Sequence, residues 1–436
     1  MTPRIEHRGK LIHECTLPDH TRADGLYPGH INAAQLSADR FLLIYTTRGW
    51  RGTDDNCSVI YQLREGACDG RLLAEGVLAP SVDDWDALGD GRRHVKGHFH
   101  PVVFGVPAGV GATPAAGHFV AMWGRHARSI DPGTGFMRNN DRATHQRTGA
   151  VEWAQFRLGA DGADIELTAP PGVLRQQGYD AGYLLCSTDA RSMHQTYTPP
   201  VPYTESGDEW VGFNTFDGGR IGALRFRFDP AKGLYAWVES GPLIGAGLME
   251  PSVSRWRDGW VVSARSVRAN REDRGGPVGW TLWDDPFSRP APELAWPEAP
   301  NTRSPLTSFR CADGRLRLLT GDPAVSPYGH PRNPLYWWPI DPDRGFRAGT
   351  PQVVFDAVAA RVPFREQARF VVDQAKVFPH TGGPRQTIAH RVRPVATNDP
   401  AKVGAPVLPV EQQAAGIYYA QAVFPESLPA QWQFDP

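Results

Sequence analysis

The chain has 436 residues, with 46 Lys and Arg against 47 Asp and Glu, which leaves a formal net charge of −1 at pH 7. A balance this close to zero excludes the uniform basic field with which proteins hold nucleic acid or an anionic membrane, so we expect neither partner. An anionic ligand would have to meet a local cluster of basic side chains. No uninterrupted apolar run reaches the about 18 residues that a membrane-spanning helix needs.

The composition favours short strands and turns over helices, because Gly and Pro number 46 and 40 and the chain also holds 14 Trp, 12 Tyr and 19 Phe. The five Cys are scattered and form no C-x-x-C pair, so neither a disulfide framework nor a zinc knuckle is indicated. The first segment, MTPRIEHRGKLIHEC, carries charges where a secretory signal would need an apolar stretch. We therefore expect a cytoplasmic protein.

One unit recurs along the chain: an apolar strand, a polar turn that usually holds Gly or Asp, and a second apolar strand. Its copies begin at Ile31, His100, Tyr197, Glu250, Ser304 and Val372. Further short strands lie between the copies, for example GAVEWAQFRL, GALRFRFDP and GPVGWTLWDD. Fair helical periodicity is confined to 351–370, which Pro363 interrupts. The pattern predicts four strands per unit.

A repeated four-stranded antiparallel sheet without covering helices must bury both of its faces against neighbouring sheets, as the blades of a β-propeller do. We therefore predict an all-β fold in which residues 1–436 form a single propeller domain. A repeat of about 62 residues favours seven blades, while the six visible hairpins leave six as the alternative. The N-terminal strand GKLIHECTL and the C-terminal strand GIYYAQAVF are expected to close the ring.

Two hairpins, EPSVSRWRDGWVVSARS and SPLTSFRCADGRLRLLTGD, resemble the inner-strand repeat of the sialidase-like, BNR-type propellers, although a complete Asp-box (S-x-D-x-G-x-x-W) is absent. The segment KGHFHPVVFG…GHFVAMWGRH is similar to the paired-histidine blade of the propeller-type polysaccharide lyases, the ulvan lyases and rhamnosyl-glucuronate lyases. HQTYTPPVPYTESGDEWVGFNTFDGGR resembles their following blade. The resemblance implies that His98, His126 and Tyr197 are catalytic.

The same resemblance implies an Arg at or near Asn214, so Arg220 or Arg265 would have to serve in its place. A lyase that cleaves beside a uronic acid removes the proton alpha to the carboxylate, with a His or Tyr as base and a second such group as acid. An Arg, whose planar fork matches a carboxylate, stabilises the enolate-like state. The function expected is thus β-elimination on a small uronate-containing oligosaccharide.

The propeller fold by itself also points to a site, because the innermost strands of all blades converge at the mouth of the central channel. The residues at the beginnings of these strands are His30, His98, Tyr197, Glu250 and Arg303. We expect His30, Glu250 and Arg303 to bind substrate there, together with Arg220 and Arg265. Arg265, at the end of an apolar strand, is the member of the Arg cluster 265–274 least expected to be only solvated.

Two other functions stay open: a sialidase-like glycoside hydrolase acting on an acidic or deoxy sugar, and a noncatalytic propeller that presents loops to a protein partner. The H-x-H pair of His98 and His100 could join His118 or His126 in a zinc site. No Cys or carboxylate has suitable spacing, so we predict no metal and no cofactor, with structural Ca²⁺ or Zn²⁺ left open. His100, which precedes Pro101, is interpreted as structural, and the acidic segment 81–90 as a loop.

Overall fold

Strands that are apolar at consecutive positions make up most of the structure, a computed structural model that describes residues 2–12, 29–47, 58–82, 85, 89, 91, 94–129, 148–177, 193–195, 197–216, 219–266, 276–302, 304–360, 370–394 and 416–431. Strand β12 (Glu209–Phe216) is buried at every position after its first, and β4 (Ser58–Glu65) is buried over its first six. Successive side chains point to opposite faces of a strand. Both faces of these sheets are therefore covered.

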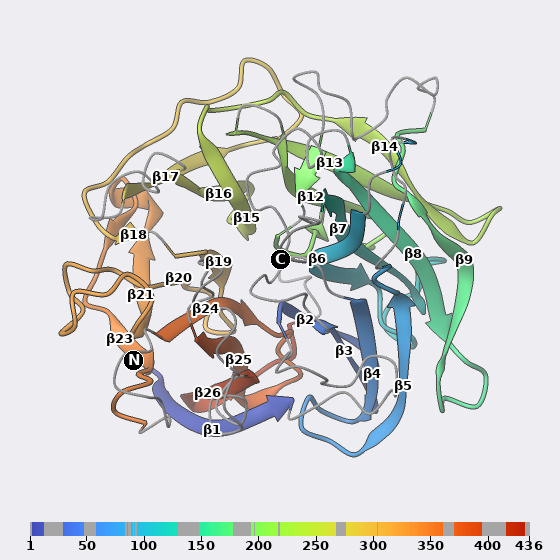
Figure 1. Cartoon of the computed structure of the whole chain (residues 1–436), viewed down its shortest axis with the longest axis horizontal. Helices are drawn as coiled ribbons and strands as arrows, with labels where there is room; N and C mark the ends of the chain where they lie inside the picture. The colour runs from blue at the N-terminus through green and yellow to red at the C-terminus, as the bar shows by residue number, and fades with distance from the viewer. Residues whose placement is uncertain are drawn as a thin grey trace.

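The strands form six antiparallel sheets arranged around one axis, as Figure 1 shows, and we number these sheets as blades in chain order. Blade 1 has the order β2-β3-β4-β5, made of Ile31–Ser37, Arg40–Thr47, Ser58–Glu65 and Leu72–Ala79. Blade 2 has the order β6-β7-β8-β9, made of His94–Gly105, His118–Ser129, Ala150–Leu158 and Ile165–Val173. Blade 3 has the order β10-β12-β13-β14, with β11 also on β12, made of Met193–Gln195, Glu209–Phe216, Arg220–Asp229, Leu234–Ser240 and Val201–Pro202.

The second half of the ring repeats the arrangement. Blade 4 has the order β15-β16-β17-β18, made of Leu248–Trp256, Gly259–Ser266, Gly276–Trp283 and Asn301–Thr302. Blade 5 has the order β19-β20-β21-β22, with β23 also on β21, made of Thr307–Arg310, Leu316–Thr320, Leu335–Asp341, Arg347–Ala348 and Gln352–Phe355. A 3-10 helix, Pro342–Arg344, follows β21. Blade 6 has the order β24-β25-β26-β1, made of Phe370–Val377, Gly383–Pro394, Gly416–Leu428 and Arg4–Ile12.

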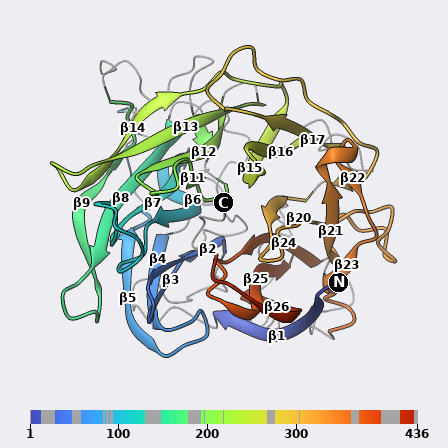
Figure 2. The same cartoon turned by 180° about the vertical axis from the view of Figure 1, so that it is seen from behind.

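The two ends of the chain meet in blade 6, where β1 pairs antiparallel with β26 from Arg4↔Val423 to Ile12↔Ile417. Figures 1 and 2 show the blue first strand lying along the red last strand from both sides. The N-terminal segment is thus the outer strand of a sheet whose other three strands come from the C-terminal part of the chain. This pairing joins the first and last blades.

The all-β propeller with four-stranded antiparallel blades is confirmed, and in the described part of the chain the blade count is six, the second of the two counts that the sequence allowed. The favoured seven assumed too short a repeat, because long connections between strands use the remaining residues. The segment with helical periodicity begins as strand β23, since Gln352–Phe355 pairs with β21. No helix among the described residues is long and apolar enough to cross a membrane.

Six apolar cores hold the ring together, one between each pair of neighbouring blades. The core between blades 2 and 3 contains Phe104 and Trp210, for example, and the core between blades 5 and 6 contains Trp337 and Ile388. The core between blades 6 and 1 includes Ile12 of β1. Burying such side chains contributes about 1.5–3 kcal/mol each, so these cores supply most of the stabilisation of the ring.

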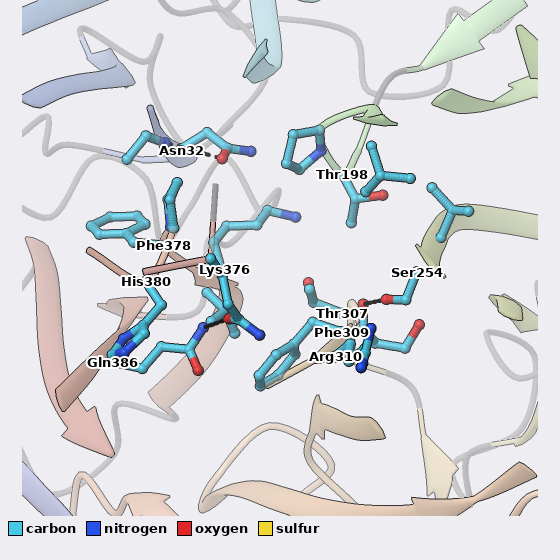
Figure 3. A pocket seen from close by; sticks show the side chains of 18 of the residues that line it. Asn32, Thr198, Ser254, Thr307, Phe309, Arg310, Lys376, Phe378, His380 and Gln386 are labelled. Atoms are coloured by element: carbon cyan, nitrogen blue, oxygen red, sulfur yellow. Dashed lines mark hydrogen bonds between the residues drawn. The ribbon is translucent and has the colours of Figure 1, made fainter. Parts of the chain in front are cut away.

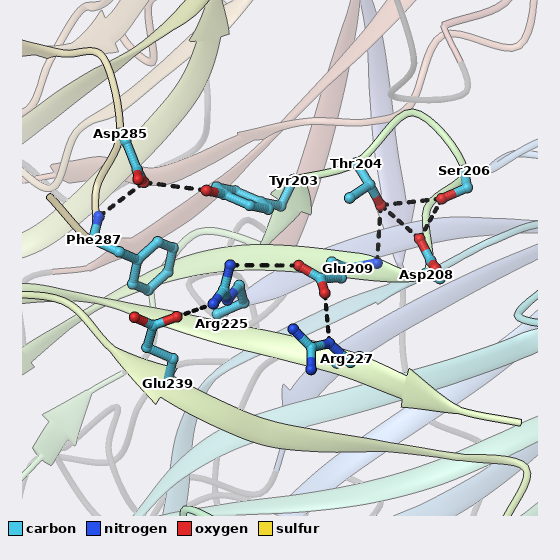
Figure 4. Close-up of polar contacts among 10 residues, drawn as sticks. All are labelled: Tyr203, Thr204, Ser206, Asp208, Glu209, Arg225, Arg227, Glu239, Asp285 and Phe287. Carbon is cyan, nitrogen blue, oxygen red and sulfur yellow. Dashed lines mark hydrogen bonds and ion pairs between the residues drawn. The ribbon is translucent and has the colours of Figure 1, made fainter. Parts of the chain in front are cut away.

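A polar contact adds to the core between blades 3 and 4 (Figure 4). The Arg225 guanidinium lies 5.3 Å from the ring centroid of Tyr203 and 5.0 Å from that of Phe287, and it pairs with Glu209 and Glu239. The Tyr203 hydroxyl donates to Asp285 Oδ1 at 3.2 Å. Because Phe287 and Asp285 follow β17 of blade 4, this arrangement connects the two blades.

We expect Arg225→Ala to lower the free energy of unfolding by about 1–2 kcal/mol, because it removes two cation–π contacts and the packing of the side chain between the blades. Arg227→Ala is the matched control: Arg227 is half exposed and pairs only with Glu209 among the described residues. It should cost less than about 0.5 kcal/mol. Urea denaturation of both variants measures this, and equal losses would contradict the connecting role of Arg225.

Candidate active site

Three innermost strands contain a bulge, and in each a residue other than glycine has positive φ. These are His100 in β6 with φ 49°, Glu250 in β15 with φ 55° and Gln374 in β24 with φ 54°. Each lies at a register shift with the next strand, between Phe99 and Val102, Met249 and Ser252, or Asp373 and Lys376. A bulge leaves its extra residue unpaired and re-aims the side chain, and such strained positions gather at functional sites. We therefore built the site from these residues.

Three aromatic rings from different blades meet at the axis. His100 stacks on His30, which precedes β2, with ring centroids 4.1 Å apart, and lies 5.1 Å from the ring of Tyr197. The His30 backbone N–H donates to Thr46 Oγ1 at 3.0 Å. All three rings are buried. His30 and Tyr197 thus lie together, and the histidine between them is His100.

Tyr197 is fully buried and contacts Lys376 of β24. The Lys376 amine lies 3.1 Å from the ring centroid of Tyr197 and donates to its backbone carbonyl at 2.8 Å. Burial raises the pKa of Tyr197 well above its usual value, and the nearby Glu250 carboxylate raises it further. Burial also lowers the pKa of Lys376 well below its usual value, against the opposite effect of Glu250. Burial therefore favours the neutral form of both groups where they meet.

Glu250 and Arg265 form a buried ion pair beside Tyr197, with 2.7 Å between Arg265 Nε and Glu250 Oε2. The pair joins neighbouring strands, since Arg265 lies opposite Met249 in the β15–β16 ladder. The Glu250 backbone N–H donates to Thr215 Oγ1 of blade 3 at 3.3 Å. We call His30, His100, Tyr197, Glu250, Arg265 and Lys376 the axial cluster.

A second buried carboxylate lies at the bulge of β24. Asp373 accepts from Arg391 Nε at 2.9 Å and from Arg332 at 2.8 Å, and both Asp373 and Arg391 are buried. Asp373 also raises the pKa of Tyr197. Asp373, Lys376 and Arg391 were not among the site residues predicted from the sequence. The sequence feature that could have indicated the first two is the run V-D-Q-A-K-V, in which the charged residues Asp373 and Lys376 interrupt a mostly apolar strand.

His98 lies in a different network. Its Nε2 is 3.4 Å from Glu152 of β8, which also accepts from Trp123 and pairs with Lys96 and Arg125 at 3.1–3.3 Å. Burial raises the pKa of Glu152, but the hydrogen bond from His98 and the surrounding positive charges lower it more, so that it lies well below its usual range. The bulge after Phe99 separates His98 from His100, whereas an unbroken strand would place both on one face.

The remaining predicted residues take other positions. His126 lies opposite Gly97 in the β6–β7 ladder, and its buried ring is 4.9 Å from Phe99. Arg220 begins β13 and is half-buried. Arg303 and the acidic residues Asp83, Asp84 and Asp86 lie outside the described residues. Within the described ranges, no three His, Cys, Asp or Glu side chains are arranged to hold a metal ion.

A scan against protein-family profiles and a search of curated proteins find no match to this sequence. Among solved structures, Trypanosoma rangeli sialidase is similar with a TM-score of 0.54 and 11% identity, over 94% of this chain and 57% of that chain. Its covalent complex with 2,3-difluorosialic acid is similar with a TM-score of 0.55 and 11% identity, over 95% of this chain and 57% of that chain. Hadza microbial sialidase Hz136 is similar with a TM-score of 0.51 and 12% identity, over 91% of this chain and 66% of that chain.

This chain therefore spans a little over half of the trypanosomal sialidase and about two thirds of the Hadza enzyme. At identities this low, the structural similarity shows a shared fold and no more than that. The resemblance of the hairpins to sialidase-like propellers is thus confirmed for the architecture, and the narrower resemblance to polysaccharide lyases has no counterpart among these three structures.

We expect Glu152→Gln to lower the free energy of unfolding by about 3 kcal/mol near pH 7, because it leaves buried positive groups uncompensated. A carboxylate whose pKa is lower in the folded state stabilises above its unfolded pKa of about 4.3 and loses this effect as the pH falls below it. The difference from the wild type should therefore shrink below about pH 4. Urea unfolding between pH 3 and 7 measures this difference in the free energy of unfolding. The control is Glu166→Gln, because Glu166 is exposed and pairs with the exposed Arg157. A difference for Glu152→Gln that does not depend on pH would contradict this role.

Proposed function

We propose that this chain is a carbohydrate-active enzyme, a glycoside hydrolase that acts on a small oligosaccharide carrying an acidic sugar. The observation that carries the proposal is the meeting of Tyr197 with Glu250: Thr198 Oγ1 donates to the Pro251 carbonyl at 3.0 Å, which brings the residues before them in the chain together. The Glu250 charge raises the pKa of the buried Tyr197 phenol. Glu250 is in turn oriented by Arg265. A nucleophile beside a base that a third group orients is a common arrangement in covalent catalysis.

A tyrosine suits an acidic sugar for an electrostatic reason. Where the carbon under attack bears or adjoins a carboxylate, a carboxylate nucleophile would be repelled, whereas a neutral phenol is not. The raised pKa of Tyr197 keeps its proton on at neutral pH, so the phenol needs a base during attack. In this proposal Glu250 accepts that proton while Tyr197 Oη attacks the anomeric carbon, and His100 of the axial cluster protonates the leaving oxygen as the glycosidic bond breaks. A water molecule then attacks the same carbon and breaks its bond to Tyr197 Oη, His100 takes a proton from the water, and Glu250 returns its proton to Tyr197.

The charge around the axis supports an anionic substrate. Three guanidiniums, those of Arg265, Arg332 and Arg391, pair with the carboxylates of Glu250 and Asp373. Arginine binds carboxylates through two parallel hydrogen bonds. A guanidinium at a buried site attracts an acidic sugar more strongly than it would in water.

A second candidate is β-elimination from a uronate, which the contact between His100 and Tyr197 favours. Their rings are 5.1 Å apart, so one could act as base at C5 and the other as acid at the leaving oxygen. This reaction needs no carboxylate in the enzyme. It therefore differs from hydrolysis in its requirement for Glu250 and in its product.

The products distinguish the candidates. We would incubate the protein with a panel of sialic acid and uronic acid oligosaccharides and follow new reducing ends together with ultraviolet absorbance. The hydrolase should release reducing ends without absorbance, and an absorbing unsaturated product would support the lyase. Absence of both on every substrate would contradict an enzyme of either kind and favour the noncatalytic propeller.

On an active substrate, Tyr197→Phe should lower turnover by about 10² or more, because it removes the reacting hydroxyl and keeps the ring. Glu250→Gln should lower turnover to a similar degree if the reaction is hydrolysis and much less if it is elimination. Tyr203→Phe is the matched control, since Tyr203 bonds Asp285 away from the axial cluster, and should turn over normally. Melting temperatures of the variants check their folding, and near-normal turnover by Tyr197→Phe would refute both candidates.

A further inference from the structure

A cavity of about 160 Å³ is lined by residues of blades 1, 3, 4, 5 and 6. We call it the axial chamber (Figure 3). Three of its lining residues come shortly after members of the axial cluster in the chain: Asn32 follows His30, Thr198 follows Tyr197 and Ser254 follows Glu250. Lys376 lines the chamber and also contacts Tyr197. The other five members of the axial cluster are not among its lining residues.

The chamber is lined by basic side chains and by no acidic one. Arg255, Arg310, Lys376 and His380 all contribute to its wall, and none of its lining residues is Asp or Glu. Arg255 lies over the ring of Trp260 at 4.6 Å, and Arg310 donates to the Gly314 carbonyl at 3.4 Å. Neither guanidinium pairs with a carboxylate among the described residues. Basic residues in the wall of a cavity whose described lining has no acidic residue indicate an anionic occupant.

Buried polar atoms in the wall also lack partners. Asn32 is 1% exposed; its Oδ1 accepts from the Ala33 N–H, but its Nδ2 has no hydrogen-bond partner among the described residues. His380 is likewise 1% exposed, and both of its ring nitrogens lack a partner there. Buried donors without partners are costly and call for a ligand or water. Figure 3 shows the Lys376 amine directed towards Asn32 and Thr198 in this space.

The other polar side chains of the wall make hydrogen bonds within the protein; these residues are Thr198, Ser254, Thr307, Ser308, Gln386 and Gln431. The remaining lining residues are apolar. Phe309, Phe378, Val253 and Pro379 line the chamber between the polar groups. Such a surface would leave the oxygens of a compact, fully hydrated anion such as phosphate unsatisfied on several sides. A carboxylate on a short hydrocarbon body matches both kinds of surface, since its two oxygens meet the donors and its body meets the aromatic rings.

We propose that the axial chamber binds a small organic carboxylate, held by Arg255 and Arg310 together with the Asn32 amide and with its hydrocarbon part against Phe309 and Phe378. The ligand lies in the chamber, whose lining does not include the histidines of the axial cluster. It is an occupant of the channel in addition to any substrate at the mouth, and its binding does not depend on the proposed hydrolysis.

Titration calorimetry with butyrate, propionate and inorganic phosphate at constant ionic strength tests this on the full chain. The wild type should bind butyrate most tightly, and Arg310→Gln and Arg255→Gln should each weaken butyrate about tenfold through the loss of a charged hydrogen bond. Arg257→Gln is the matched control, because Arg257 is exposed, pairs with Asp343 and does not line the chamber. Its affinity for butyrate should equal that of the wild type.

A crystal structure of the wild type with butyrate gives an answer that needs no variant, and should show the carboxylate between Arg310 and Asn32. Three outcomes would overturn the proposal: no binding of butyrate, phosphate bound as tightly as butyrate, or an affinity unchanged in both chamber variants. Butyrate found only at the axial cluster would overturn it as well. Turnover of an acidic oligosaccharide, measured separately, reports on the proposed function alone.

Discussion

Burial of both faces of every sheet is the constraint on which the rest of this structure depends. Each apolar core is shared by two blades, so no blade can bury its faces alone and the sheets must continue until the ring closes. The last core uses Ile12 of β1, which is why the N-terminal strand belongs to blade 6. Closure then brings the innermost strands of all blades around one axis, and distant segments of the chain supply one site.

The bulges decide which side chains reach that axis. In an unbroken strand His98 and His100 would share a face, and alternation would direct both in the same way. The positive φ of His100 breaks this alternation, so that His98 pairs with Glu152 within blade 2 while His100 stacks on His30. Packing on both sides of the blade holds the strained backbone in place. Glu250 is placed beside Tyr197 by the same device on another blade.

The axis combines paired charges with neutral reacting groups. Glu250 and Asp373 are held by guanidiniums, while burial raises the pKa of the Tyr197 phenol and lowers the pKa of the Lys376 amine, which favours the neutral form of both. This arrangement avoids an uncompensated buried charge, which would be costly. Lys376 contacts Tyr197 and also lines the axial chamber. The axial cluster and the chamber differ in chemistry, because the axial cluster contains the Glu250 carboxylate whereas no acidic residue is among the described residues that line the chamber.

The sequence by itself determined the architecture, because strand length, turns and near-continuous apolar runs are local properties. It also placed His30, Tyr197 and Glu250 at the beginnings of inner strands, since that position follows from the repeat. Only the tertiary structure decided the blade count, which depends on how much chain lies in connections, and the identity of the axial histidine. His100 was interpreted as structural because Pro101 follows it, yet a bulge is where a proline is tolerated in a strand. Asp373, Lys376 and Arg391 meet their partners from other strands and blades, and contacts of that kind leave no local pattern in a sequence.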